Sequence, residues 1–136
     1  MTAQNDTFWL KLDQLVTDHR WVIDRPKGSH HPRYPSFIYP LDYGYLEGTQ
    51  AADGGGIDIW VGSMPDGMVT AIACTVDMKK RDAEVKILLG CTSQEAQEIL
   101  SVHNDEFGFQ AAVLVERPSP GKNGLELVGE EKKPQG

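Results

Sequence analysis

Four aspartates have positions in the sequence that suit the chemistry of a divalent cation. Asp53 precedes three glycines, Asp58 follows them, and Asp77 and Asp82 flank a short basic loop. If the segments around this loop pair as an antiparallel hairpin, Asp77 and Asp82 face each other, and opposed like charges destabilise a hairpin. Mg²⁺, which prefers carboxylate and water oxygens, would relieve this repulsion.

The same loop offers a simpler explanation for the two aspartates. Its basic residues Lys79, Lys80 and Arg81 could balance the carboxylates without any ion, and aspartate is a common turn former. On spacing alone, the solvated hairpin and the cation site both stay open. In a cation site, the basic residues would be available to anionic oxygens of a substrate.

Basic and aromatic residues form a second group earlier in the chain. Lys27 and Arg33 lie close in sequence to several phenol hydroxyl groups, a combination that suits a phosphate. The phenols are those of Tyr34, Tyr39, Tyr43 and Tyr45. The adjacent His30 and His31 do not predict a metal site, because neighbouring side chains of an extended segment point apart. The sequence contains no serine-nucleophile elbow, phosphate-binding P-loop or dinucleotide-binding glycine motif.

The composition indicates one folded domain, over residues 1–136, with a mobile tail from about 119 to 136. The chain has 20 Asp and Glu against 13 Lys and Arg, a formal net charge of −7, and 40% hydrophobic residues. This acidic balance argues against nucleic-acid binding and against an anionic membrane surface, because phosphates repel negative charge. No apolar stretch is long enough to span a membrane, and no signal-peptide pattern opens the chain. We therefore expect a cytoplasmic protein.

The elements that must position these residues are mostly short strands. Hydrophobic patterns predict helices over residues 8–19, capped by Thr7, and 93–102, the second with a capping box of Thr92 and Glu95. Further patterns predict extended chain over 37–45 and strands over 21–25, 57–62, 69–76, 83–89 and 110–115. This content indicates a mainly β (α+β) fold, a small barrel or sandwich with flanking helices.

In this order, the motifs resemble the soluble family I inorganic pyrophosphatases. The runs Tyr39-Pro40-Leu41-Asp42-Tyr43-Gly44-Tyr45 and Asp53-Gly54-Gly55-Gly56-Ile57-Asp58-Ile59 carry the resemblance, with Asp77 and Asp82 at the hairpin. The similarity extends over about residues 22–89. It implies an OB-like five-stranded β-barrel with flanking helices, Mg²⁺-dependent hydrolysis of pyrophosphate to two phosphates, with Mn²⁺ as an alternative ion, and a homo-oligomer.

The resemblance also implies roles for individual residues. The metal ligands would be Asp53, Asp58, Asp77 and Asp82. Tyr43 would lie near the attacking water, and Asp24 would act through a metal-bound water, so these two are the candidate catalytic residues. The candidate substrate-binding residues are Arg33, Lys27 and Lys86.

Three differences from the family pattern affect the expected chemistry. Gly55 stands where the family has a third signature aspartate, and a glycine cannot accept a proton. Glu84 replaces a substrate-binding lysine, although Lys86 lies on the same strand face, and His103-Asn104 replaces a phosphate-binding Tyr-Lys pair. The alternatives are therefore a hydrolase of the same architecture that acts on another phosphate compound, or a catalytically weakened metal- or phosphate-binding protein.

Overall fold

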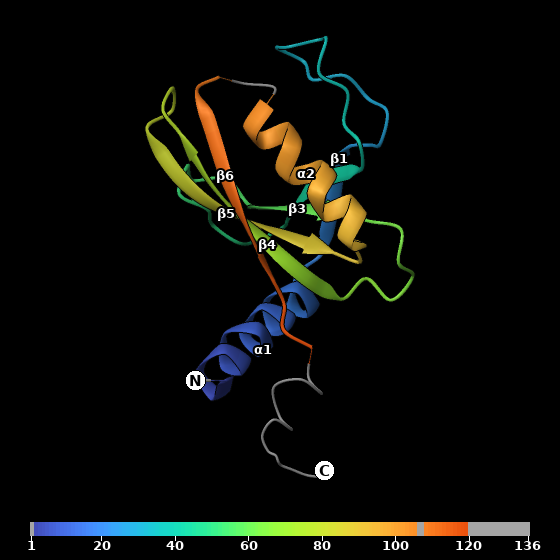
Figure 1. The fold of residues 1–136 in the computed structure, drawn as a ribbon, viewed down its shortest axis with the longest axis vertical. Helices are drawn as coiled ribbons and strands as arrows, with labels where there is room; N and C mark the ends of the chain where they lie inside the picture. The colour runs from blue at the N-terminus through green and yellow to red at the C-terminus, as the bar shows by residue number, and fades with distance from the viewer. Residues whose placement is uncertain (1, 106–107, 120–136) are drawn as a thin grey trace.

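The structure, a computed structural model, describes residues 2–105 and 108–119 (Figure 1). Helix α1 (Thr2–Asp18) is followed by strands β1 (Trp21–Arg25), β2 (Asp42–Leu46), β3 (Ile57–Val61), β4 (Val69–Asp77) and β5 (Asp82–Leu89), then helix α2 (Ser93–Asp105) and strand β6 (Gln110–Glu116). The strands form one sheet in the order β1-β2-β3-β5-β4-β6. Neighbouring strands are antiparallel except for β3 and β5, which are parallel.

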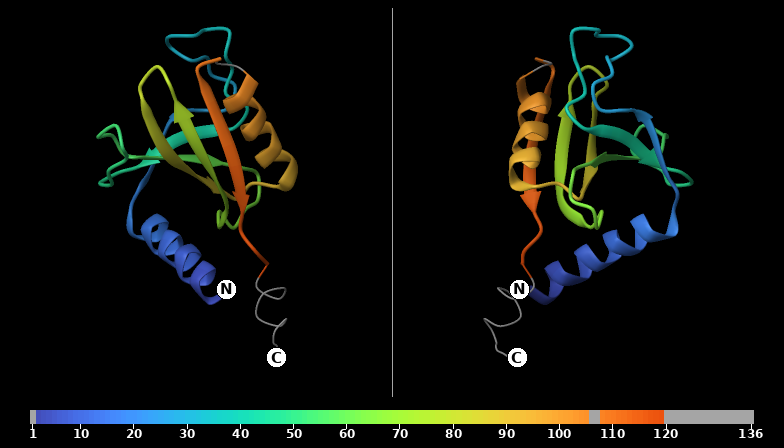
Figure 2. Two further views of the ribbon diagram at one scale, coloured as in Figure 1. Left: turned by 60° about the vertical axis from the view of Figure 1, so that its left-hand side comes forward. Right: turned by 90° about the vertical axis from the view of Figure 1, so that its right-hand side faces the viewer.

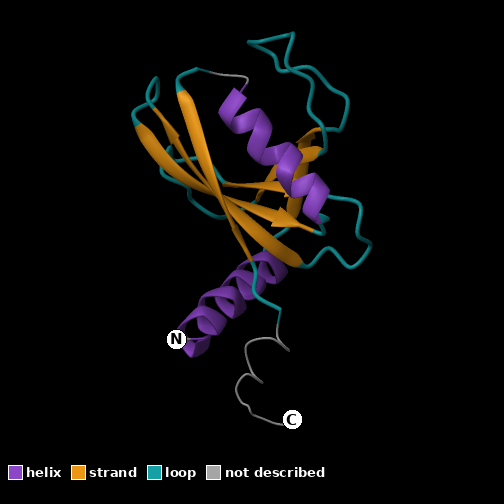
Figure 3. Ribbon diagram, viewed as in Figure 1, coloured by secondary structure: helices purple, strands orange, loops and turns teal. Residues whose placement is uncertain are grey.

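The mainly β prediction is confirmed, whereas the five-stranded count is wrong. Strand β6 pairs with β4 from Ala71↔Glu116 to Asp77↔Gln110 and so adds a sixth strand at one edge of the sheet (Figure 3). Strand β1 forms the other edge, and no pairing within the described residues joins it to β6. Closure into a barrel is therefore not confirmed.

Each helix covers a different face of the twisted sheet (Figure 2). Trp9 and Val16 of α1 belong to one buried cluster, and Ile87 of β5 points into it. The next residue of β5, Leu88, points into a second cluster with Ile99 of α2. This alternation is the period of a strand that is buried on both faces. The face towards α2 is the one that carries the candidate site.

The helix boundaries follow local capping for α2 but not for α1. Thr92 and Glu95 form the predicted capping box, with Oγ1 of Thr92 3.1 Å from the Glu95 amide and Oε1 of Glu95 2.9 Å from the Thr92 amide. Helix α1 begins at Thr2, so the prediction that Thr7 caps it is wrong. The segment before Thr7 contains no glycine or proline that would stop the helix.

The long segment between β1 and β2 folds back on itself beside the sheet. Its only sheet-like pairing among the described residues is the isolated bridge His30↔Ile38, and the predicted extended run becomes strand only at Asp42. Phe37 and Tyr39 are buried and anchor this segment in the α2-side cluster.

The structure describes the chain up to residue 119. From residue 120 on, the predicted mobile tail lies outside the described residues. Among the helices that the structure describes, neither is both long and apolar enough to cross a bilayer.

Candidate functional site

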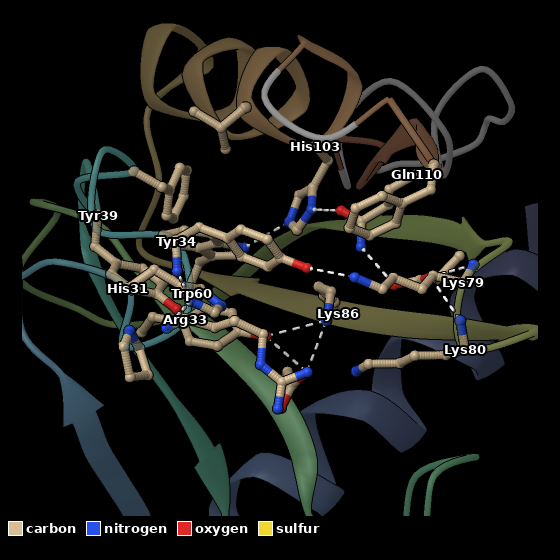
Figure 4. A pocket seen from close by; sticks show the side chains of 17 residues that line it. His31, Arg33, Tyr34, Tyr39, Trp60, Lys79, Lys80, Lys86, His103 and Gln110 are labelled. Carbon is tan, nitrogen blue, oxygen red and sulfur yellow. Dashed lines mark hydrogen bonds and ion pairs between the residues drawn. The ribbon is translucent and has the colours of Figure 1, made fainter.

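A cavity of about 910 Å³ opens on the α2 side of the sheet, between the β1–β2 segment, the sheet and the end of α2 (Figure 4). Its charged lining consists of four cationic side chains and two carboxylates, namely Arg33, Lys79, Lys80 and Lys86 with Asp58 and Asp77. The aromatic lining consists of Tyr34, Phe37, Tyr39, Tyr43, Trp60 and Phe109. The cavity therefore combines an excess of positive charge with flat apolar walls, which is a suitable environment for an anion that carries an organic group.

Lys86 lies at the base of this cavity and is held by three acceptors. Its ammonium Nζ is 2.7 Å from Oδ2 of Asp58, 3.0 Å from the Tyr43 hydroxyl and 3.3 Å from Oε1 of Glu84. The Lys86 side chain is only 7% exposed. Burial disfavours the charged form, but the interactions with Tyr43 and with the Asp58 carboxylate outweigh it, so the pKa of Lys86 is raised.

Strand register explains why Asp58 and Lys86 meet. The parallel pairing of β3 with β5 sets Ile59 opposite Ile87, so the preceding residues of the two strands, Asp58 and Lys86, also lie side by side. Tyr43 reaches the same place from β2, where it is the partner of Trp60.

Tyr43 completes the hydrogen bonding around Asp58. Its hydroxyl donates to Oδ2 of Asp58 across 2.7 Å while it accepts from Lys86. Burial raises the pKa of Tyr43 well above the ordinary value of a phenol, and the Asp58 carboxylate acts in the same direction. Tyr43 is therefore a neutral donor, and its predicted role near an attacking water stays a prediction.

Glu84 is the buried carboxyl group next to this network. Its side chain is 5% exposed, and Oε2 has no hydrogen-bond partner among the described residues. Burial raises the pKa of Glu84, and the charges of Asp58 and Asp53 raise it further, against the opposite effect of Lys86. Asp53 itself is exposed, and its pKa is lowered chiefly by the Gly55 amide, which donates to Oδ1 across 2.9 Å.

The two hairpin aspartates face each other as predicted, since Asp77 pairs with Asp82 at the end of the β4–β5 ladder. Asp77 is buried, and its Oδ1 accepts 2.9 Å hydrogen bonds from the backbone amides of Lys79 and Lys80. Its Oδ2 accepts from Nε2 of Gln110 across 3.3 Å. Asp77 thus shapes the basic loop, in the manner of a turn-forming aspartate.

The four predicted metal ligands do not form a ready cation site in this arrangement. In the part of the chain that the structure describes, no three His, Cys, Asp or Glu side chains are placed so that they could hold a metal ion. Lys86 and Tyr43 both donate hydrogen bonds to Oδ2 of Asp58. Oδ2 of Asp58 is therefore already occupied by two donors as the side chains are arranged, and the metal-binding roles of Asp53, Asp58, Asp77 and Asp82 stay predictions.

The remaining predicted residues divide between the cavity and the outer surface. Arg33 lines the cavity. Lys27 is exposed outside the cavity lining, and its backbone amide donates to Oδ1 of Asp42 across 2.8 Å. Asp24 is also absent from the lining, because the register between β1 and β2 shifts between Ile23 and Arg25 and leaves Asp24 at an irregularity of an edge strand.

Sequence reasoning missed the polar residues that close the inner end of the cavity. Nε1 of Trp60 donates to Nε2 of His103 across 3.2 Å, and Nδ1 of His103 lies 2.7 Å from Oε1 of Gln110. Lys79 donates to the Tyr34 hydroxyl across 2.9 Å and also lies over the rings of Tyr34 and Phe109. Trp60 is 43 residues from His103 and Tyr34 is 45 from Lys79, so no spacing pattern identifies these pairs.

Solved structures of bacterial proteins share this fold. The chain matches an inorganic pyrophosphatase from Neisseria gonorrhoeae with a TM-score of 0.55 and 17% identity, covering 71% of this chain and 81% of that one. A structure described as an inorganic phosphatase from Anaplasma phagocytophilum matches with a TM-score of 0.53 and 14% identity, covering 71% and 83%. The inorganic pyrophosphatase of Helicobacter pylori matches with a TM-score of 0.50 and 13% identity, covering 76% of this chain and 85% of that one.

The likeness to these structures is one of fold. The described chain has the fold of bacterial inorganic pyrophosphatases, and the resemblance read from the sequence motifs is confirmed at this level. No protein-family model and no curated protein sequence matches the chain.

Proposed function

We propose that this protein binds a phosphate compound in the cavity and hydrolyses it. The observation that carries the proposal is the charge of the lining, where four cationic side chains, those of Arg33, Lys79, Lys80 and Lys86, outnumber two carboxylates. The chain as a whole has a net charge of −7, so the cavity is positive against an acidic background. A concave site of this kind attracts anions. The pyrophosphatase fold supports hydrolysis as the reaction.

Arg33 and Lys80 are the side chains we assign to the phosphate oxygens. Neither side chain forms a hydrogen bond or ion pair with another described residue, so their donors are available. Lys79 donates to Tyr34, and Lys86 is engaged by Asp58, Tyr43 and Glu84. A guanidinium and an ammonium together suit a phosphate, because Arg binds two oxygens at once and Lys acts as a point charge.

The size and the aromatic walls of the cavity favour a compound larger than pyrophosphate. Cavities that bind small organic molecules measure about 300–1,000 Å³ and are mostly apolar with a few polar groups. At about 910 Å³, this cavity lies near the top of that range. We therefore propose a phosphate ester or anhydride that carries a flat ring, with the ring against Tyr34 and Phe109.

Mg²⁺-dependent hydrolysis of pyrophosphate is the second candidate function. The likeness to pyrophosphatase structures favours it, and Mn²⁺ is the alternative ion. In this candidate, Asp53, Asp58, Asp77 and Asp82 keep their predicted roles as metal ligands, and Tyr43 and Asp24 keep their predicted catalytic roles. A cytoplasmic location and self-association into a homo-oligomer are likewise proposals, and light scattering on the purified chain tests the second.

A substrate panel separates the two candidates. Phosphate release is measured from pyrophosphate, from aryl phosphates and from nucleoside mono-, di- and triphosphates, each with Mg²⁺ and with EDTA. We expect a ring-bearing phosphate compound to be the best substrate and the Arg33→Ala variant to lose most of the activity. Pyrophosphate as the best substrate would establish the second candidate, and no release and no binding with any compound would refute both.

A further inference from the structure

The carboxylate cluster beside the cavity already contains a cation. The Lys86 ammonium lies between Asp58 and Glu84, 2.7 Å and 3.3 Å from their oxygens. An ammonium has three N–H donors, and those of Lys86 have three acceptors, the third being the Tyr43 hydroxyl at 3.0 Å. Lys86 therefore has no N–H donor left for a ligand, and its positive charge balances the carboxylates of Asp58 and Glu84.

The burial of this arrangement makes the lysine difficult to displace. The side chains of Lys86 and Glu84 are 7% and 5% exposed. A buried ammonium that lost its carboxylate partners would be an uncompensated charge, which is strongly destabilising. A divalent ion that displaced Lys86 from Oδ2 of Asp58 would have to meet this cost as well as its own dehydration.

The backbone, and not side-chain flexibility, brings the lysine to this place. Asp58 and Lys86 occupy equivalent positions in neighbouring parallel strands, one residue before the pair Ile59↔Ile87. Both of these isoleucines are fully buried in the cluster under α1, which fixes the register of the two strands. The ion pair is therefore built into the sheet.

We propose that Lys86 is the resident cation of this cluster, so that the cavity receives its phosphate ligand without a divalent ion at Asp58. The first half of the proposal stands on the geometry of Lys86 alone, and the second rests on the proposed function. Lys86 is then a positioning residue that neutralises Asp58 and Glu84, while Arg33 and Lys80 contact the ligand.

Metal binding is the direct test of the first half. Mn²⁺ binding is measured by equilibrium dialysis and electron paramagnetic resonance for the wild type, Lys86→Met, which removes the charge, and Lys86→Arg, which keeps it. We expect no stoichiometric binding to the wild type or Lys86→Arg at about 1 mM Mn²⁺, a concentration at which weak protein sites fill. Lys86→Met should bind one ion at least about tenfold more tightly. The double variant Lys86→Met with Asp58→Asn should lose this binding.

Two results would overturn the first half. One is a stoichiometric Mn²⁺ site in the wild type that Asp58→Asn abolishes, a measurement that needs no Lys86 variant. The other is a folded Lys86→Met protein without any gain in Mn²⁺ affinity. Circular dichroism establishes whether Lys86→Met is folded. If Lys86→Met does not fold, Lys86→Gln is used in its place.

Calorimetry with inorganic phosphate and pyrophosphate, in EDTA and in Mg²⁺, tests the second half. Equal affinity for the anion in EDTA and in Mg²⁺ supports the proposal. Binding that needs Mg²⁺ in the wild type and is lost in the Asp58→Asn variant overturns it. Absence of binding to these anions and to every compound of the substrate panel would refute the proposed function, while the Mn²⁺ result would stand by itself.

Discussion

The indole N–H of Trp60 donates a 3.2 Å hydrogen bond to Nε2 of His103, which ties β3 to the last turn of α2. Because Nε2 accepts, Nδ1 carries the ring proton and donates to Oε1 of Gln110 across 2.7 Å. The amide of Gln110 in turn donates to Asp77 across 3.3 Å, and these bonds are drawn in Figure 4. A continuous polar chain thus joins the helix, three strands and the basic loop, and it requires a neutral imidazole.

The neutral His103 predicts a loss of stability in mild acid. Burial lowers the pKa of His103 to about 4, whereas an unfolded histidine titrates near 6.5. Between about pH 6.5 and 4, the unfolded chain binds more protons than the folded one, so the free energy of unfolding falls as the pH falls. The full contribution is about 3 kcal/mol. Urea denaturation across this range should give a steeper pH dependence for the wild type than for His103→Gln, and equal slopes would contradict the prediction.

Tyr43 should contribute to stability through its hydroxyl group. Tyr43→Phe removes the donor to Asp58 and an acceptor of Lys86, both in a site largely shielded from water. Leaving buried partners unsatisfied costs about 1–3 kcal/mol, which urea denaturation would detect. Tyr45→Phe is the matched control, since no hydrogen bond joins the Tyr45 hydroxyl to another described residue, and it should change the free energy of unfolding by less than about 0.5 kcal/mol. Similar losses of unfolding free energy in both variants would show that the hydrogen bonds around Asp58 do not stabilise the fold.

The local elements could be predicted from the sequence because their signals are local. Strand β1, the β4–β5 hairpin with Asp77 opposite Asp82, and the capping box of Thr92 and Glu95 all follow from short patterns. Asp24 lies at the register shift between Ile23 and Arg25, an irregularity that no local pattern indicates, and its catalytic role stays a prediction.

The centre of the candidate site could not be predicted in the same way. Lys86 and Asp58 are 28 residues apart, and they meet only because β3 and β5 pair in parallel in one particular register. The family resemblance implies a substrate-binding role for Lys86 and a metal-binding role for Asp58. In the structure the two side chains form an ion pair with each other. The chain Trp60–His103–Gln110 depends in the same manner on where α2 and β6 lie against the sheet.

Phosphate binding should depend on the basic residues inside the cavity and not on basic residues in general. Arg33→Ala and Lys80→Ala each remove a charge from the lining. A hydrogen bond to a charged group is worth about 1.5–3 kcal/mol, so each variant should weaken the binding of pyrophosphate or of an aryl phosphate by roughly tenfold or more in calorimetry. Lys27→Ala is the control, because Lys27 is exposed and outside the lining. Comparable losses in all three variants would mean that general charge, and not the cavity, attracts the anion.

The glycine-rich turn before β3 should respond differently to substitution at two adjacent positions. Gly54 has a φ of +87°, a conformation that costs a residue with a Cβ about 1–2 kcal/mol. At Gly55, a built Cβ would lie 3.4 Å from Oδ1 of Asp53, an ordinary contact, and φ is not in the left-handed region. Gly54→Ala should therefore lower the free energy of unfolding by about that amount, while Gly55→Ala should change it by less than about 0.5 kcal/mol. Because both variants place the same methyl group in the same exposed turn, their difference isolates backbone conformation. If Gly55→Ala leaves the stability unchanged, Gly55→Asp can be made in a folded protein. This variant restores the aspartate of the pyrophosphatase signature, and its activity can be assayed directly.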